Sequence, residues 1–476
     1  MWRSDAAGGE WRADLTPPAP IPREKPLGLV SLLRVLAHNP LEAWTVRHFQ
    51  EPVVMQGLSL AKVAVVSDPA AIRHILLENT GNYHKDWLQR RVLSAGLTGG
   101  LLTAEDQQWR MQRRALAPLF SRKNVMSFLV PMIDAAQDLV ARLAQRDGQV
   151  VDLAVEVTRV TLDVLERTIF SDGLGRDRED IRMAMKTYFD TIGRLDPFDI
   201  LGVPDVVPRP GRRKLRPMLR LFESTIDAII ANRRARVADD PQNTPRDILT
   251  LLLEARDPES GQPLSEMEIR ASILTFIAAG HETTANCIAW SLYLLSQSDT
   301  WRDRVQAEAD RELDRVTDDL ADRLIHTRAV IDESNRLYPP ITAISRVALG
   351  PDQLAGTDIP GGTMVVIAPY ILHRHRTLWV KPDSFDPNRF LGTARERIDR
   401  YAYLPFGAGP RVCIGSTFAL QEAAIVIATL MPHFNFTPAP GHIVWPVQKV
   451  TLRPKDGLPM IVRRRKTQYG VFDLGQ

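Results

Sequence analysis

The sequence predicts a mainly α-helical protein with small β-sheets, organised as a single large domain. Helical periodicity dominates from about residue 105 to residue 340, whereas β-type runs such as residues 364–368 are short. The 476 residues leave room for roughly three average domains, but no repeat of fixed period and no low-complexity linker divides them. One large helical domain is therefore favoured over three small ones.

Composition and charge exclude several classes of protein. Charged residues make up 25% of the chain, but the formal net charge is only +3, which lacks the single-signed bias of a nucleic-acid binder. The two cysteines, Cys287 and Cys413, are too few for a disulfide framework or a thiolate zinc cluster. Such sparse use of cysteine is typical of a reducing compartment, so we expect a cytoplasmic protein.

The N-terminal residues are expected to form a Pro-rich segment, residues 1–40, ahead of the main domain, residues 41–476. The head of the chain contains neither the apolar core of a signal peptide nor a hydrophobic span, so no membrane anchor is expected there. The strongest apolar run, residues 271–295, carries His281 and Glu282 at its centre. A lipid-spanning helix would bury these groups at a cost of several kcal/mol, so we interpret the run as a buried helix.

Helix boundaries are marked at several places. A helical pattern rich in Trp and Arg is expected from residue 105 to residue 131. Ser265 followed by Glu268 is a capping box that opens a helix reaching about residue 299 without a proline. Other expected elements are a last helix at residues 416–430, closed by Pro432, and loops at residues 196–210 and 257–264.

Cys413 lies in a glycine-rich loop directly before the last expected helix, in the stretch FGAGPRVCIG that runs from residue 406 to residue 415. Glycines allow the backbone to come close to a large flat group. The first amide N–H groups of the following helix favour the thiolate, which suits a haem iron as axial ligand. Arg411 is placed to pair with a carboxylate at the edge of the same group. The alternative is a buried structural cysteine, the usual fate of a single Cys.

The centre of the long helix carries the stretch AGHETT at residues 279–284. Gly280 costs about 1 kcal/mol relative to alanine inside a helix, which indicates that something needs the space. Thr283 is placed to hydrogen-bond the carbonyl of Ala279, four residues back, and to loosen the turn. Together with the Glu282 carboxyl, these residues form a groove beside a proton source. The alternative is a kinked core helix whose polar groups bond to neighbouring backbone.

Both stretches resemble parts of the cytochromes P450. The loop matches every fixed position of that family's haem-binding loop, Phe-x-x-Gly-x-Arg-x-Cys-x-Gly, and the helix centre is similar to the family's oxygen-activating segment. The resemblance spans roughly residues 83–459. It implies the cytochrome P450 fold, with heme b (iron protoporphyrin IX) as the cofactor and Cys413 as the metal ligand. It also implies that Glu282 and Thr283 are the catalytic pair that delivers protons during oxygen activation.

The resemblance further implies which residues hold the cofactor. Trp109 and Arg113 stand four apart on an expected helix, so their N–H groups can face the same way and bind haem propionates. Arg346 matches a third such position, and Lys85 is either a fourth or a surface cation. The expected cofactor-binding residues are Cys413, Lys85, Trp109, Arg113, Ala279, Gly280, Arg346, Phe406, Arg411 and Gly415.

A scaffolding group is expected nearby. Glu333 and Arg336 are three apart on a helical run and match the family's Glu-x-x-Arg. The family's third member comes from a Pro-x-Arg-Phe stretch, so Arg389 is expected to share the same glutamate.

Substrate contacts follow from the order of the matching segments along the chain. Most side chains in these segments are apolar, which favours a hydrophobic substrate such as a fatty acid or terpenoid, although any core contains the same residue types. The expected contacts are Leu97, Phe276, Ala279, Ile341, Ile344 and Val450.

Electrons are expected from a separate protein. No Gly-rich nucleotide fingerprint follows Cys413, so no fused reductase is expected. A ferredoxin or flavodoxin is expected to dock on the cysteine side of the haem. Four basic residues, Arg110, Arg114, Arg122 and Lys123, are either that docking patch or an ordinary solvated face.

The predicted activity is therefore that of a soluble, bacterial-type haem-thiolate monooxygenase, which inserts one atom of O2 into its substrate and reduces the other to water. One rival is a peroxide-driven or isomerising haem-thiolate enzyme, although such relatives commonly lack the acid and threonine pair. The other is a haem-based sensor without turnover, which needs no redox partner.

Overall fold

The computed structural model describes residues 15–58, 61–86, 99–171 and 215–465. Leu97 and the expected loop at residues 196–210 lie outside these residues. The main helices are α1 (Leu29–His38), α2 (Pro69–Arg73), α4 (Asp106–Leu116), α5 (Arg122–Met126), α6 (Leu129–Ala144), α7 (Leu153–Leu165), α11 (Leu215–Asp239), α12 (Ile248–Glu254), α13 (Glu266–Gln297), α14 (Asp299–Glu312), α15 (Leu320–Arg323), α16 (Ile325–Leu337), α17 (Pro369–Leu372), α18 (Gly392–Glu396) and α19 (Ser416–Leu430).

Short 3-10 or π turns connect these helices. They are η1 (Pro40–Ala43), η2 (Val46–Phe49), η3 (His74–Glu78), η4 (Thr80–Asn82), η5 (Ala117–Phe120), η6 (Glu166–Phe170), η7 (Pro387–Phe390) and η8 (Gly409–Arg411). The strands are β1 (Val53–Leu58), β2 (Ala61–Val66), β3 (Tyr83–His84), β4 (Val150–Asp152), β5 (Ile344–Ala348), β6 (Asp352–Leu354), β7 (Thr357–Ile359), β8 (Met364–Ile367), β9 (Phe434–Pro438), β10 (Pro446–Gln448), β11 (Leu452–Pro454) and β12 (Pro459–Arg464).

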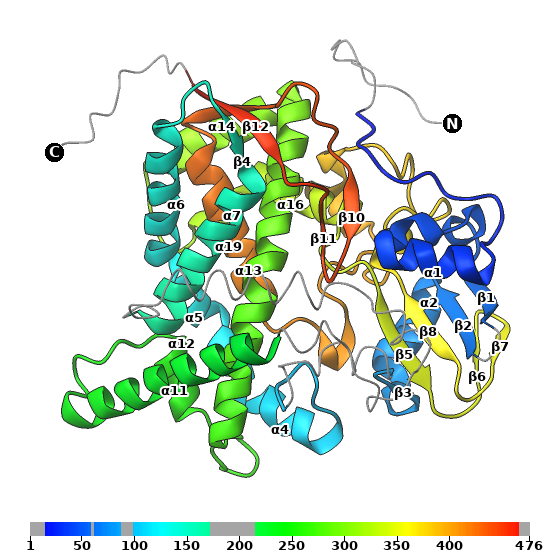
Figure 1. Cartoon of the computed structure of the whole chain (residues 1–476), viewed down its shortest axis with the longest axis horizontal. Coiled ribbons are helices and arrows are strands. Elements are labelled where there is room, and N and C mark those ends of the chain that lie inside the picture. Colours follow the sequence, from blue (N-terminus) through cyan, green and yellow to red (C-terminus); the bar gives the residue numbers. More distant parts are fainter. Residues whose placement is uncertain (1–14, 59–60, 87–98, 172–214, 466–476) are drawn as a thin grey trace.

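The strands form small sheets beside a large helical body. The largest sheet has the order β1-β2-β8-β5-β3, in which only β2 and β8 run parallel, with Val63 opposite Met364. This sheet lies on one side of the molecule, and α6, α7, α19 and α13 lie on the other (Figure 1). The remaining sheets are β4-β12-β9, β10-β11 and β6-β7. The expected class, mainly helical with small sheets, is confirmed.

The long helix α13 runs through the middle of the helical body. Its start is fixed by the expected capping box, because the Ser265 hydroxyl accepts from the Glu268 N–H and the Glu268 carboxylate accepts from the Ser265 N–H. The helix packs against α7, α19 and α16, and most of its side chains are buried. A helix that is apolar on nearly all sides belongs in a core, so the reading of residues 271–295 as a buried helix is confirmed.

The region from residue 105 to residue 131 is largely helical, as expected, but it is divided into several helices. Helix α4 ends at Leu116, and η5 and α5 separate it from α6, which starts at Leu129. Pro118 lies in η5, and its missing N–H breaks the α-helical pattern. Pro131, the last residue of the expected pattern, lies in the first turn of α6, where no intrahelical hydrogen bond is lost.

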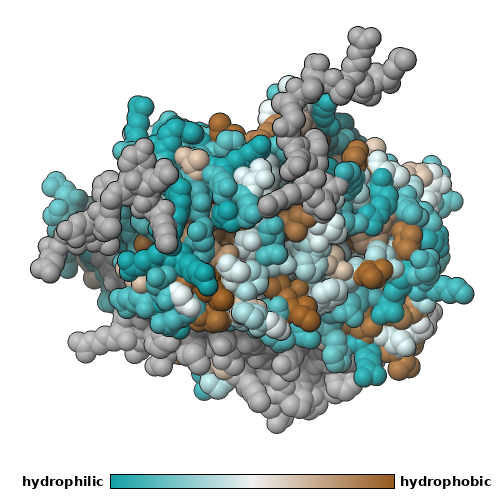
Figure 2. All heavy atoms as spheres, turned by 90° about the horizontal axis from the view of Figure 1, so that it is seen from above, coloured by the Kyte–Doolittle hydropathy of each residue, from teal (hydrophilic) through white to brown (hydrophobic). Residues whose placement is uncertain are grey.

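The first described residues pack on the rest of the domain. The Leu15 carbonyl accepts from the Phe385 N–H at 2.8 Å, and the Pro18 carbonyl accepts from the Tyr338 hydroxyl at 2.8 Å. Among the described residues, no helix is both long and apolar enough to cross a membrane. The face seen from above is mainly hydrophilic, with hydrophobic residues in small separate groups (Figure 2). The boundary at residue 40 stays a prediction.

A fully buried ion pair joins α16 to the loops that follow it. Arg336 donates to both Glu333 oxygens at 2.7 Å, and both side chains are 0% exposed. The same guanidinium donates to the carbonyls of His373, Pro382 and Ser384, at 2.8, 2.6 and 2.9 Å. Arg389 lies 3.6 Å from Glu333, so the expected three-residue group is confirmed.

Replacing Arg336 with leucine is expected to lower the free energy of unfolding by about 3–5 kcal/mol, because Glu333 is left buried without its partner. Arg47→Leu is the control, since the pair of Arg47 with Glu51 is exposed and contributes little. Urea denaturation followed by circular dichroism measures both variants. Equal effects of the two substitutions would contradict the assignment.

Candidate active site

The Cys413 loop, residues 404–415, is held in shape by its own backbone and by glycines. The Cys413 N–H donates to the Phe406 carbonyl at 2.9 Å. Gly407 and Gly409 have φ angles of 73° and 72°, which other residues rarely adopt. A Cβ on Gly409 would lie 1.9 Å from the carbonyl oxygen of Leu76, so only glycine allows the loop to pack against η3.

The Cys413 side chain is accessible to solvent although protein surrounds it. This combination indicates that the sulfur faces a hollow, and burial by the surrounding protein raises the pKa of the thiol. The Gly415 N–H and the Arg113 guanidinium oppose that rise. The Cys413 pKa is therefore raised overall, which is opposite to the expected preference for the thiolate. For the protonated thiol, the effect of burial outweighs that of the helix N-terminus. A bound iron would reverse this balance, since a thiol that coordinates a metal ion loses its proton.

The centre of α13 contains an exposed residue between buried turns of the helix. Ala279 is exposed, whereas Ile273 and Ile288 are fully buried. The Thr283 hydroxyl donates to the Ala279 carbonyl at 2.7 Å, as expected. Because the turns on either side of Ala279 are buried, the exposed centre of α13 faces a hollow. The space that Gly280 leaves is occupied, as expected, because a Cβ there would lie 3.2 Å from the Leu165 side chain of α7.

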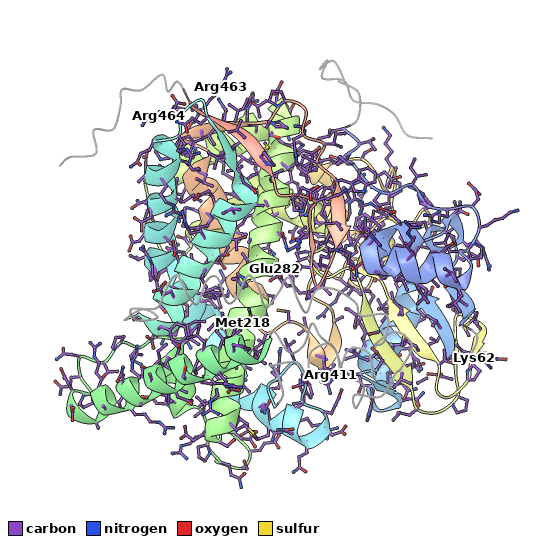
Figure 3. The ribbon with its side chains drawn as sticks, viewed as in Figure 1. Lys62, Met218, Glu282, Arg411, Arg463 and Arg464 are labelled. Carbon is purple, nitrogen blue, oxygen red and sulfur yellow. The ribbon has the colours of Figure 1, made fainter. Side chains whose placement is uncertain are left out.

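The Glu282 carboxylate turns towards the C-terminal hairpin, residues 446–454, which consists of β10 and β11. The Thr451 hydroxyl donates to Glu282 Oε1 at 2.8 Å, and an Arg453 nitrogen lies 3.9 Å from the same oxygen. Figure 3 shows Glu282 near mid-length of α13. Thr451 was missed from the sequence, although it follows Val450 directly.

Cations gather near the sulfur. Arg411 forms an ion pair with Glu105 and stacks over the Trp109 ring at 4.3 Å. Burial, with repulsion from Arg411, lowers the pKa of Arg346 to about 10. Burial also lowers the pKa of Arg113, and the Cys413 sulfur raises it. In the view of Figure 3, Arg411 lies between α13 and the five-stranded sheet.

Lys85 and Glu105 complete this group. The Lys85 ammonium is buried and donates to the carbonyls of Leu102 and Ala104, at 2.8 and 3.0 Å. Glu105 was missed as the partner of Arg411, and its position directly before α4, four residues from Trp109, is the signal that marks it.

These residues fit a flat, anionic cofactor such as haem. Arg346 is 8% exposed, and the one hydrogen bond of its guanidinium within the described residues goes to the Ser345 carbonyl, at 2.7 Å. Arg113 makes no hydrogen bond or ion pair to another described residue. Two guanidinium groups that are shielded from solvent and pair with no acid among the described residues, next to an exposed thiol, match a cofactor that carries carboxylates.

The expected substrate residues do not share one environment. Ile341 is 37% exposed, Ile344 lies beside Gly407 of the Cys413 loop, and Val450 is partly exposed at the C-terminal hairpin. Phe276 is buried edge-to-face against Phe120, with ring centroids 5.0 Å apart. Leu97 lies outside the described residues.

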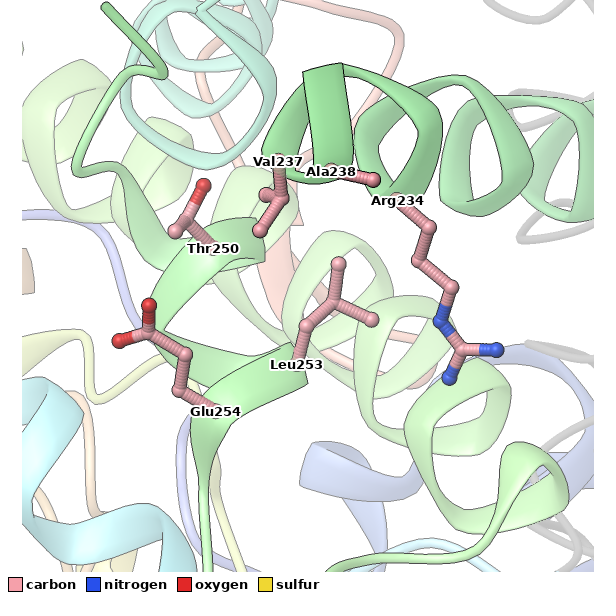
Figure 4. A pocket seen from close by; sticks show the side chains of 6 residues that line it. All are labelled: Arg234, Val237, Ala238, Thr250, Leu253 and Glu254. Atoms are coloured by element: carbon pink, nitrogen blue, oxygen red, sulfur yellow. The ribbon is translucent and has the colours of Figure 1, made fainter. Parts of the chain in front are cut away.

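A separate pocket lies between α11 and α12 (Figure 4). It is lined by Arg234, Val237, Ala238, Thr250, Leu253 and Glu254. None of these residues belongs to the Cys413 loop or to the centre of α13, so this pocket is not part of the candidate site.

Fold and site together are those of a protein that binds haem, and comparison with known proteins names the family. The profile "Cytochrome P450" matches residues 19–460. "Putative cytochrome P450 132" of Mycobacterium tuberculosis is 33% identical, over 84% of this chain and 87% of its own. "Cyclooctat-9-en-7-ol 5-monooxygenase" of Streptomyces melanosporofaciens is 30% identical, over 81% and 82%. The crystal structure of the "cytochrome P450DA heme domain" superimposes with a TM-score of 0.82 at 27% identity, and covers 94% of this chain and 99% of that one.

The chain belongs to the cytochrome P450 family. It is a cytochrome P450 monooxygenase with a haem cofactor, as its resemblance predicted, and it uses O2, an organic substrate and a redox partner.

Replacing Gly409 with alanine is expected to destabilise the protein by about 3 kcal/mol or more and to reduce haem retention, because the new Cβ overlaps the Leu76 backbone. Gly441→Ala is the matched control. Gly441 has a similar φ of 78° but nothing within 4 Å of an added Cβ, so it carries only the backbone strain, about 1 kcal/mol. Urea unfolding and the haem-to-protein absorbance ratio measure the difference, and equal losses would refute the packing role.

Proposed function

We propose that this monooxygenase hydroxylates or epoxidises a hydrophobic organic compound, such as a fatty acid or terpenoid. The observation that carries the proposal is exposed apolar surface at the centre of α13 and after α16, where the side chains of Ala279 and Ile341 are exposed. The name of the Streptomyces relative gives cyclooctat-9-en-7-ol as the compound that is oxygenated. This name supports the same class of substrate.

Cys413 is proposed to ligate the haem iron. Trp109, Arg113, Arg346, Arg411 and Lys85 are proposed to stabilise the haem carboxylates, and Ala279, Gly280, Phe406 and Gly415 to lie against the ring. When bound, a haem of this type activates O2, so that one atom enters the substrate and the other leaves as water. Buried guanidinium groups lower the cost of placing carboxylates inside the protein.

Glu282 and Thr283 are proposed to supply protons to the hollow. Thr283 holds its hydroxyl at the exposed stretch of α13, and Glu282 is the ionisable neighbour in the chain. The Thr283 hydroxyl already donates its proton to the Ala279 carbonyl. Its oxygen can therefore accept a hydrogen bond from a donor in the hollow. A correctly placed general acid typically contributes about a hundredfold to ten-thousandfold in rate.

The electron donor is proposed to be a separate ferredoxin or flavodoxin. The protein is proposed to lie in the cytoplasm, since Cys287 and Cys413 form no disulfide. Two of the four basic residues considered for docking are already neutralised, because Arg114 pairs with Asp257 and Arg122 with Asp322. Arg110 and Lys123 are exposed and pair with no acid within the described residues. They are therefore the stronger part of the proposed patch.

Apolar compounds are expected to shift the Soret band of the ferric protein towards the high-spin position, whereas their polar partners are not. A panel of terpenoid alcohols and long-chain fatty acids, each compared with its own glucoside or glycerol ester, measures this by difference spectroscopy. Ile341→Asn is expected to raise the dissociation constant of the best compound about tenfold, because an apolar contact is lost. Preferential binding of the polar partners would overturn the substrate class.

Thr283→Ala is expected to keep haem and substrate binding but to divert reductant into hydrogen peroxide, so that product per O2 falls about tenfold or more. Product, peroxide and reductant are measured together with a ferredoxin system. Thr284→Ala is the matched control, since Thr284 is buried and its hydroxyl has no hydrogen-bond partner. Tight coupling in Thr283→Ala would remove Thr283 from the proposed role.

A further inference from the structure

One face of α13 is bonded to the C-terminal hairpin through polar groups. Glu282, Asn286 and Trp290 are spaced four residues apart, so they lie on the same side of the helix. Glu282 and Asn286 both bond to Thr451, and the Trp290 indole donates to the Leu452 carbonyl at 3.3 Å. The hairpin is therefore fixed to the half of α13 that begins at the proposed catalytic acid.

The direction of the hydrogen bonds between these residues is determined by their chemistry. The Asn286 amide donates to the Thr451 oxygen at 3.0 Å, and an amide N–H cannot accept. The Thr451 hydroxyl proton is thus available only for the Glu282 carboxylate, 2.8 Å away. Thr451 is 2% exposed and Asn286 is 7% exposed, so water does not compete for these bonds.

Thr451 itself is held in place from the other side. The N–H of Leu452, the next residue, donates to the Pro340 carbonyl at 2.9 Å. The Lys449 N–H donates to the Thr451 carbonyl at 2.9 Å and closes the turn between β10 and β11. Because its backbone is anchored on both sides, Thr451 cannot follow Glu282 if the carboxylate turns. It therefore acts as a fixed point for that side chain.

We propose that Thr451 is a positioning residue that orients the Glu282 carboxylate for proton delivery, with Asn286 fixing the direction of the Thr451 hydroxyl. This rests on the proposed role of Glu282. The hairpin also carries Val450, one residue before Thr451, and its anchor at Pro340 directly precedes Ile341. The same backbone thus joins the acid to two of the expected substrate contacts.

The first test measures the hydrogen bond itself and needs no turnover. The infrared carboxylate bands of Glu282 are obtained as the difference between the protein and its Glu282→Gln variant. Thr451→Val removes the hydroxyl at nearly constant shape, so these bands are expected to shift, whereas Thr451→Ser restores them. Thr429→Val is the matched control, because Thr429 is buried in α19 and its hydroxyl has no hydrogen-bond partner.

The second test measures coupling, which is the amount of product formed per O2 consumed. Thr451→Val is expected to lower the product formed per O2 about tenfold, as a charged hydrogen bond of ordinary strength implies, without changing the substrate dissociation constant. Thr451→Ser is expected to recover most of the loss. In the Glu282→Gln background, Thr451→Val is expected to add nothing, because both changes act through one carboxyl group.

Asn286→Asp gives an independent variant if Thr451→Val fails to fold. An aspartate accepts the Thr451 proton and takes it away from Glu282, so the same loss of coupling is expected. Unchanged infrared bands, full coupling in both variants, or additive losses with Glu282→Gln would each overturn the proposal. These outcomes differ from failure of the proposed function, in which the unaltered protein, with a normal thiolate carbon-monoxide spectrum, makes no oxygenated product.

Discussion

The ion pair between Glu333 and Arg336 is the interaction on which the position of the Cys413 loop depends. Arg336 holds the carbonyl of His373, and the His373 imidazole in turn accepts from the Leu404 N–H at 2.8 Å, at the start of the Cys413 loop. Burial lowers the pKa of His373 to about 3, so the ring stays neutral and keeps a nitrogen free to accept. A charge pair in α16 is thereby connected, through one histidine, to the backbone that presents the sulfur.

The sequence was sufficient where a short stretch determines its own geometry. The capping box of α13, the bounds of α19 and the glycine-rich loop are local patterns, and the structure reproduces all three. The helical pattern expected at residues 105–131 is present, but its division into separate helices was not predicted, because the effect of a proline depends on its place in a turn. Pro118 interrupts the pattern, whereas Pro131 is accepted in the first turn of α6.

Contacts between distant segments could not be predicted from the sequence. The pair of Glu105 with Arg411 joins residues about three hundred positions apart, and the bond of Thr451 to Glu282 spans 169 positions. The position of Glu105, four residues before Trp109, marks that acid, but no periodicity or spacing records which distant residue it pairs with. The net direction of the Cys413 pKa was equally hidden. It depends on how much protein surrounds the sulfur, and burial there exceeds the effect of the neighbouring N–H and guanidinium groups.

Gly280 determines how closely α13 approaches α7. The position beside its α-carbon is filled by Leu165 of α7, 3.2 Å from where a Cβ would stand. A larger side chain at either residue must therefore be offset by a smaller one at the other, or the two helices move apart. Exchanging bulk between them, as in Gly280→Ala combined with Leu165→Val, offers a way to adjust the path of α13 past Ala279 through its packing on α7, while Cys413, Glu282 and Thr283 stay unchanged.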